Sequence, residues 1–270
     1  MKYLKLFTSH SDYNTAKSSL DKPNVSLCAT ENEVHYNPYV PPVILVTKYN
    51  ITNTSAQTQI VGGVSGTYYT SEFTAIEIDG VVQPNVVSKY TFDTLGEHTI
   101  KYTLANPISI GNNAFYGCTA LTSCTIPSGV TSIGEFAFYN CYNLASVTIP
   151  NTIINIGKQA FRWCSKLTEM TIPSGVTNIN DLVFGNCSGL TSVTIPSDVT
   201  SIGSSAFVNC SGLTSVTVEA ITAPSIQSST FQNIKTNGTL TVPSGSSGYD
   251  TWMGTGDYYL GKYSWTKVEQ

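Results

Sequence analysis

Apolar and polar residues recur along the middle of the chain with a fixed step of 23 residues. Three apolar positions define the step: Ile110, Ile133, Ile156, Ile179 and Ile202; Phe115, Phe138, Phe161, Phe184 and Phe207; and Leu121, Leu144, Leu167, Leu190 and Leu213. A degenerate sixth copy continues at Ile226, Phe231 and Leu240. Because one such unit cannot bury its apolar side chains alone, whereas stacked copies can, the pattern predicts a solenoid.

Each copy contains two patterns of different period. The stretch "LTSVTIP" alternates apolar residues with Thr and Ser, which predicts a short strand ended by proline. A turn and a second short extended piece, "VTSI", follow. The stretch "IGxxAFxxCxxL" spaces its apolar residues as a helix does, which predicts two to three helical turns. The expected coil is therefore a strand, a turn, a short strand and a short helix.

The segments around the repeats differ from them in composition. Residues 41–104 hold short β-branched and aromatic runs and an Asp-Gly hairpin signal in "EIDGVV", which predict a small antiparallel, sandwich-like β unit over the open end of the solenoid. Residues 105–247 are the solenoid of about six coils, and residues 248–270, rich in Tyr and Trp, are an expected C-terminal aromatic cap. Residues 1–40 are expected to form a module of a short helix, "SDYNTAKSSL", and a hairpin.

The repeat "IGEFAFYNCYNLASVTIPNTI" and its copies resemble the 23-residue units of BspA-like leucine-rich repeat proteins, over about residues 105–243. The tail "VPSGSSGYDTW" resembles the C-terminal end of such proteins, and the β unit before the repeats looks Ig-like. The resemblance implies a curved parallel sheet on one face and helical or irregular structure on the other. It also implies a non-enzymatic bacterial surface protein that adheres to protein or glycan ligands.

A second interpretation rests on the opening segment. Residues 1–40 are similar to N-terminal modules of gut bacterial and bacteriophage proteins, and no apolar core of a secretory signal stands at the start of the chain. The alternative function is therefore a virion or assembly component with residues 1–40 as the docking piece. In that case a virion or cytoplasmic location replaces the cell surface.

Composition bears on the possible partners. Charged residues make up 11% of the chain, its formal net charge is −4, and Arg162 is its single arginine, which argues against nucleic-acid binding. No apolar run approaches the ~18 residues of a membrane helix, so membrane insertion is not expected. Nothing in the pattern calls for a cofactor.

Five cysteines share the repeat register, Cys118, Cys141, Cys164, Cys187 and Cys210, and raise three possibilities. A straight column offers any point in space only two near sulfurs, whereas zinc requires about four converging ligands. Disulfides between neighbours would need side chains that point toward one another. We therefore expect core residues, with no metal site and no disulfide. The repeats contain no histidine and no nucleophile elbow, so no catalytic residue is assigned.

Two sets of exposed residues are candidates for ligand binding. One is a threonine column on the strands, Thr125, Thr148, Thr171, Thr194 and Thr217, expected to form a continuous hydroxyl ladder. Threonine is also simply a good exposed strand residue. The other is the place where the repeat departs most from its consensus, at Tyr139, Tyr142, Arg162, Trp163 and Lys166. Tyr, Trp and Arg are enriched in binding hot spots, although these aromatics can also pack against a neighbouring coil or the β unit.

Overall fold

The computed structural model describes residues 25–30, 33–38, 41–256 and 259–270, and the chain divides into two units, Met1–Pro42 and Val43–Gln270. In the first unit, β1 (Val25–Thr30) pairs antiparallel with β2 (Glu33–Pro38), at the place of the expected hairpin. The short helix expected over residues 11–20 lies outside the described residues.

The second unit begins with an antiparallel β unit. Its sheet runs β3 (Ile44–Ile51), β10 (Gly96–Leu104), β7 (Phe73–Ile78) and β8 (Val81–Val82). Two small pairs accompany it, β4 (Thr58–Gln59) with β9 (Lys89–Tyr90) and β5 (Gly63–Val64) with β6 (Thr67–Tyr68), together with the 3-10 turn η1 (Thr70–Glu72). Asp79 and Gly80 between β7 and β8 both have positive φ, so the hairpin predicted from "EIDGVV" is confirmed.

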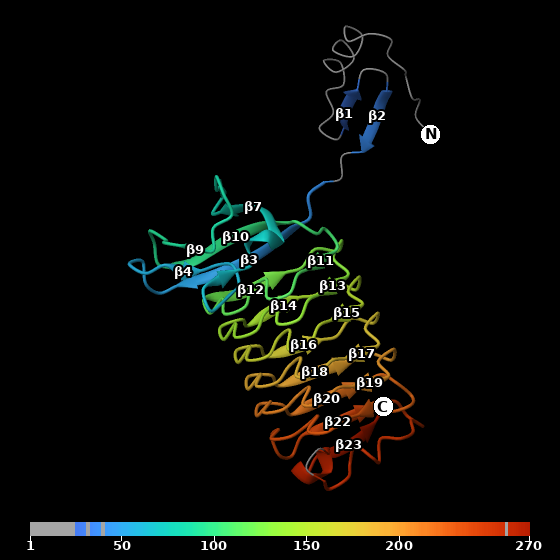
Figure 1. The fold of residues 1–270 in the computed structure, drawn as a ribbon. Helices are drawn as coiled ribbons and strands as arrows, with labels where there is room; N and C mark the ends of the chain where they lie inside the picture. The colour runs from blue at the N-terminus through green and yellow to red at the C-terminus, as the bar shows by residue number, and fades with distance from the viewer. Residues whose placement is uncertain (1–24, 31–32, 39–40, 257–258) are drawn as a thin grey trace. The chain divides into compact units, whose positions relative to one another are not determined.

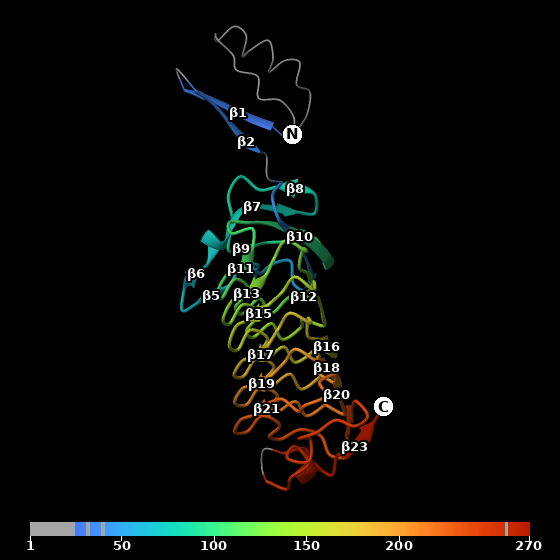
Figure 2. The same cartoon turned by 90° about the vertical axis from the view of Figure 1, so that its right-hand side faces the viewer.

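The repeats form a solenoid of short parallel strands, as predicted (Figure 1). Its long strands are β12 (Leu121–Thr125), β14 (Ser146–Thr148), β16 (Glu169–Thr171), β18 (Ser192–Ile195), β20 (Ser215–Val218) and β22 (Thr239–Val242). A second row, facing the viewer in Figure 2, holds β11 (Ser109–Ile110), β13 (Ser132–Ile133), β15 (Asn155–Ile156), β17 (Asn178–Ile179), β19 (Ser201–Ile202) and β21 (Ser225–Ile226). We number the coils one to six by their core phenylalanines, from Phe115 to Phe231.

The short helix expected in each coil is wrong: the segment is a run of turns. In the second coil Phe136 and Asn140 adopt the left-handed conformation, with φ of 56° and 60°. The N–H groups of Phe136, Phe138 and Asn140 donate to carbonyls of the third coil, at 2.8 to 3.0 Å. An α-helix would direct those donors back along its own chain. The spacing that favoured a helix therefore reflects burial alone, because the hydrogen bonds run between coils.

The core of the solenoid is a column of stacked rings. The six coil phenylalanines are buried, with ring centroids of neighbours 5.2 to 5.8 Å apart and nearly parallel planes. The predicted burial of the five register cysteines is confirmed. From the second to the fifth coil, each thiol also donates to the phenylalanine carbonyl of the preceding coil, at 3.1 to 3.3 Å. These cysteines thus fill space and satisfy a backbone acceptor.

Both ends of the long-strand sheet are paired within the second unit. At the first coil, β3 lies antiparallel to β12, so the sheet of the β unit continues into the solenoid. At the sixth coil, β23 (Thr266–Glu269) pairs with β22 after the 3-10 turn η2 (Leu260–Tyr263). Trp252 packs on Phe231 with ring centroids 5.4 Å apart and donates from Nε1 to the Pro224 carbonyl. β3 and β23 thus cover the outer edges of β12 and β22, and β23 becomes the last strand of its sheet.

The parallel ladders are interrupted once, in the middle of the solenoid. Among residues 41–256, no strand pairing joins β14 to β16 or β15 to β17. The break coincides with Asn180, which replaces a glycine. A Cβ at the equivalent Gly157 or Gly203 would lie 2.5 or 2.7 Å from a backbone nitrogen of the preceding coil, so the backbone at these two glycines leaves no room for a side chain. At Asn180 the side-chain amide, in place of the backbone, donates to the Ile156 carbonyl.

Candidate ligand-binding face

The five residues where the repeat departs from its consensus lie on the turn side of the second and third coils. Tyr142 and Trp163 are 41% and 37% exposed, and Lys166 is exposed as well. The Arg162 guanidinium lies over the Tyr139 ring, with 5.9 Å from Cζ to the centroid. The Lys166 backbone N–H donates to the Tyr142 carbonyl at 3.2 Å. The structure thus joins Arg162 to Tyr139 and Lys166 to Tyr142 across the boundary between the two coils.

A cluster of tyrosines continues this surface toward the β unit. Tyr116 of the first coil stacks on Tyr139, with centroids 4.7 Å apart. Burial raises the pKa of Tyr116, and the neighbouring phenols of Tyr139, Tyr142 and Tyr69 raise it further. Sequence reasoning missed Tyr116 and Tyr69. The repeat register alone would have found Tyr116, because it occupies the same position as Tyr139 and Arg162.

The Arg162 side chain is held from one end. Its Nη1 donates to Oε1 of Gln159 at 2.7 Å, while its Nε is buried and has no hydrogen-bond partner among the described residues. A guanidinium fixed by one amide and one ring is oriented before any ligand arrives.

Trp163 adopts a backbone conformation that its residue type disfavours. Its φ is 68°, in the left-handed region. The equivalent residues of the other coils are Gly117, Asn140, Asn186, Asn209 and Asn233. Glycine and asparagine visit this region readily, whereas a bulky side chain there is an outlier. A large, partly exposed indole at a strained position is the kind of feature that points to a binding role.

The threonine column is not the continuous ladder that the sequence predicted. Thr125 pairs with Thr148, and Thr171 pairs with Thr194 and then Thr217. Between Thr148 and Thr171 the sheet is broken, so the hydroxyl groups form two separate rows. The second row extends to Thr241, which the sequence analysis did not include. Because of this break, the threonines do not form one long flat array of hydroxyl groups that a ligand could contact.

The titratable groups do not converge on a reactive centre in the described part of the chain. Burial raises the pKa of Cys118 and of Cys187 to about 12, and raises that of Cys141, Cys164 and Cys210 well above its usual value, so these thiols stay protonated. His98 lies between two acceptors, with Nδ1 2.6 Å from Asp79 Oδ2 and Nε2 2.9 Å from the Thr94 carbonyl. Both ring nitrogens are therefore used in structural contacts.

Two further findings concern the described residues as a whole. They contain no group of three or more His, Cys, Asp or Glu side chains arranged to hold a metal ion. They also contain no helix with the length and apolar character that a bilayer crossing requires.

The repeats are similar to those of known proteins. A family model described as "BspA type Leucine rich repeat region" matches residues 108–238 in six copies. No curated protein matches the chain. Solved structures similar to it include the leucine-rich repeat protein of T. pallidum, with 28% identity over 50% of this chain and 66% of that one and a TM-score of 0.42. The pneumococcal vaccine antigen PcpA is 15% identical over 63% of this chain and 46% of its own, with a TM-score of 0.45.

A leucine-rich cell surface protein of Faecalibacterium prausnitzii is 24% identical over 53% of this chain and 60% of its own, with a TM-score of 0.28. The chain thus spans 66% or less of the length of each of these three proteins, and it corresponds to part of them.

Proposed function

Because residues 108–238 of this chain are a BspA-type leucine-rich repeat region, we propose that the protein is a non-enzymatic ligand-binding or adhesion protein of a microbial surface. The binding face is the turn side of the first three coils, and the ligand is a protein or a glycan. We call this surface the binding face. It consists of Tyr116, Tyr139, Tyr142, Arg162, Trp163 and Lys166.

One observation carries the proposal. The aromatic and basic side chains gather on adjacent coils, while the same positions in the fourth and fifth coils hold Gly185, Asn186, Val208 and Asn209. Repeat proteins bind through the surface created by side chains that vary between otherwise equal units. Large aromatics and arginine, partly exposed on a rigid scaffold, are the residue types that dominate binding energies.

The fold supplies the rigidity that such a face needs. The turns that carry it are bonded from coil to coil, with Trp163 N–H donating to Gly185 O at 2.9 Å and Asn140 N–H to Arg162 O at 3.0 Å. Directly beneath lie the stacked phenylalanines of the core. Side chains on a preorganised backbone lose little entropy on binding.

The test is a screen of the full chain on glycan and protein arrays, followed by affinity measurements on variants. We expect Tyr142→Ser with Trp163→Asn, which installs the residue types of the later coils, to weaken binding at least roughly tenfold. The control is Ile221→Ser, which removes an exposed apolar side chain of 58% exposure at the other end of the solenoid. Equal binding by wild type and the double variant would refute this face.

A further inference from the structure

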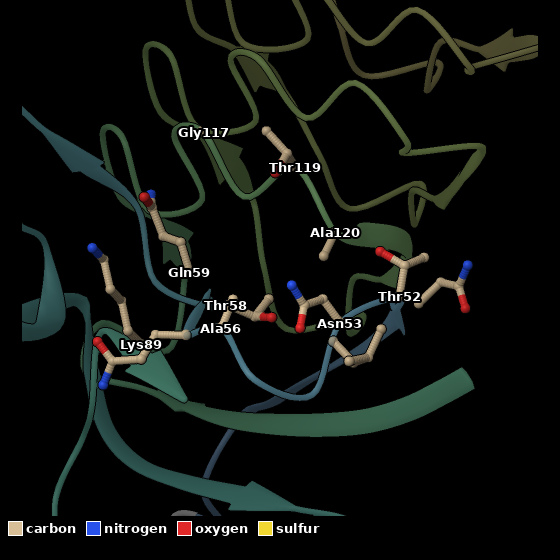
Figure 3. A pocket seen from close by; sticks show the side chains of 12 residues that line it. Thr52, Asn53, Ala56, Thr58, Gln59, Lys89, Gly117, Thr119 and Ala120 are labelled. Carbon is tan, nitrogen blue, oxygen red and sulfur yellow. The ribbon is translucent and has the colours of Figure 1, made fainter. Parts of the chain in front are cut away.

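A groove lies where the β unit meets the first coils. It consists of two adjoining depressions of about 360 and 420 Å³ that share Asn50, Thr52, Thr119 and Ala120. We call it the junction groove. Its other lining side chains include Asn53, Gln59 and Lys89 at one end and Thr122, Asn143 and Lys166 at the other. Figure 3 shows the first depression, with side chains from the segment after β3 and from the turn at 117–120 facing the same space.

The groove is a product of the junction between antiparallel and parallel strands. Asn50 N–H donates to the Ala120 carbonyl at 2.9 Å, which ties the end of β3 to the first coil. The pairing of β12 with β3 shifts register between Leu121 and Ser123, and such bulges redirect side chains at sites. Gly117 has φ of 73°, and a Cβ there would meet only the Gln59 amide, at 3.5 Å. The left-handed backbone, and not a lack of space, therefore favours glycine beside Gln59.

The polar groups of the lining are fixed before a ligand binds. Gln59 Nε2 donates to the Tyr116 carbonyl and Asn143 Nδ2 to the Thr119 carbonyl, both at 2.7 Å. Thr122 Oγ1 donates to the Lys48 carbonyl at 3.1 Å. Each amide keeps its carbonyl oxygen as an acceptor with no hydrogen bond to a described residue, and the Thr122 hydroxyl keeps its lone pairs. Such oriented acceptors suit a ligand that presents several hydroxyl groups.

The charge of the groove has one sign. Lys89 and Lys166 line it and no carboxylate does, although the chain as a whole is acidic. Lys89 reaches this position because it pairs with Gln59 across the β4 and β9 strands. Neither lysine forms an ion pair with a described residue, unlike Lys48, which contacts Glu97 at 2.7 Å. The Lys89 ammonium lies over the Tyr68 ring, 5.5 Å from its centroid. Two ammonium groups without a carboxylate partner among the described residues favour an anionic ligand.

From these observations we propose that the junction groove binds an acidic oligosaccharide, with its carboxylate or sulfate groups on Lys89 and Lys166 and its hydroxyls on Gln59, Thr122 and Asn143. This inference rests on the proposed function and names the ligand class for it. Tyr142 of the proposed binding face is exposed and is next in sequence to Asn143, which lines the groove. A peptide ligand is disfavoured because the apolar residues of the lining, Ile51 and three alanines, offer no large pocket for an anchoring side chain.

The experiment measures binding of the full chain by calorimetry to three acidic oligosaccharides and their neutral counterparts: oligogalacturonate with its methyl ester, sialyllactose with lactose, and a heparin hexasaccharide with its desulfated, carboxyl-reduced form. We expect at least one acidic member to bind at least roughly tenfold more tightly than its counterpart, because a charge-assisted hydrogen bond contributes about that factor. Lys89→Gln and Lys166→Gln each lose roughly that tenfold. Lys235→Gln, at an exposed position of the sixth coil, changes nothing.

Other outcomes overturn the inference. Absence of binding by all three acidic members up to about 1 mM excludes a useful site. Tight binding of polyglutamate with the same dependence on the two lysines assigns the groove to acidic peptides. Another ligand could bind in a way that requires Tyr142 and Trp163 but neither lysine. That result is consistent with the proposed function and refutes the groove as a binding site. If a ligand binds and its affinity depends on none of Tyr142, Trp163, Lys89 and Lys166, both the proposed binding face and the groove are refuted.

Discussion

The turn sides of the first three coils and of the next three share one backbone and differ in the residue that follows the core phenylalanine. It is aromatic or basic in the first three coils and is Gly185, Val208 and Gln232 in the next three. Both halves place left-handed residues at the same two positions of the coil and bond alternate N–H groups to the following coil. In the fourth to sixth coils, Asn209 and Asn233 donate from Nδ2 to Oδ1 of the preceding asparagine at 2.8 and 2.9 Å, forming a ladder. In the third coil Trp163 stands in that column.

The difference shows that different coils of one repeat can contribute mainly to stability or mainly to ligand recognition. The asparagine ladder satisfies the left-handed backbone and adds side-chain hydrogen bonds, so the later coils are built for stability. The third coil gives up that asparagine for an indole 37% exposed to solvent. The core beneath is unchanged, since Phe161 and Phe207 are equally buried.

The largest expected effect concerns that shared core. Phe161→Ala and Phe207→Ala should each lower the free energy of unfolding by about 3–5 kcal/mol, because each removes a buried ring from the middle of the stack. Urea unfolding followed by circular dichroism measures both. A cost below about 1 kcal/mol at either site would show that the two halves do not share one packed column.

A smaller effect of opposite sign is expected at the surface. Trp163→Asn should raise the free energy of unfolding by about 1 kcal/mol, because asparagine tolerates φ of 68° and extends the ladder toward Asn186. The reverse exchange, Asn209→Trp, is the matched control and should lower stability by at least that amount. If both exchanges destabilise equally, the indole at 163 is a structural residue and the contrast between the halves disappears.

The smallest expected effect is a pH dependence of stability that arises from two residues of the β unit, His98 and Asp79. Burial by itself lowers the pKa of His98, but the bonds to the Asp79 carboxylate and the Thr94 carbonyl outweigh it, and the pKa of His98 is raised. Burial raises the pKa of Asp79, yet its bonds to His98 and to the Thr99 N–H lower it overall. A raised histidine pKa stabilises the fold below its unfolded value, 6.5, and that stability is lost as pH rises through the folded value.

The lowered Asp79 pKa adds stability above 3.8 that is lost in acid, so the pair contributes most between pH 3.8 and 6.5. Urea midpoints recorded from about pH 5 to pH 9 should fall on the alkaline side for wild type and fall less for His98→Gln. Identical profiles for the two proteins would rule out this linkage.

The features that could be predicted from the sequence are those that the repeat period determines. Burial of the phenylalanines, leucines and cysteines follows from the 23-residue step, because every copy must face the same core. The helix was mistaken because apolar spacing reports burial and not the destination of hydrogen bonds, which here run between coils. Pairing of β3 with β12 joins residues far apart in the chain, so no local pattern announces it or the groove beside it. The ladder break coincides with asparagine for glycine at Asn180. Gln227 replaces the same glycine in the sixth coil, where β19 still pairs with β21, so this exchange alone does not predict a break.

The most direct test of the binding face is hydrogen–deuterium exchange of the full chain with and without a ligand found by the array screen. We expect slower exchange on binding at residues 117–122, 139–145 and 162–166, which carry the groove rim and the aromatic face. The equivalent turns at 185–189 and 208–212 should exchange at unchanged rates. Protection confined to those later turns, or to the threonine rows of the sheet, would contradict the assignment of recognition to the first three coils.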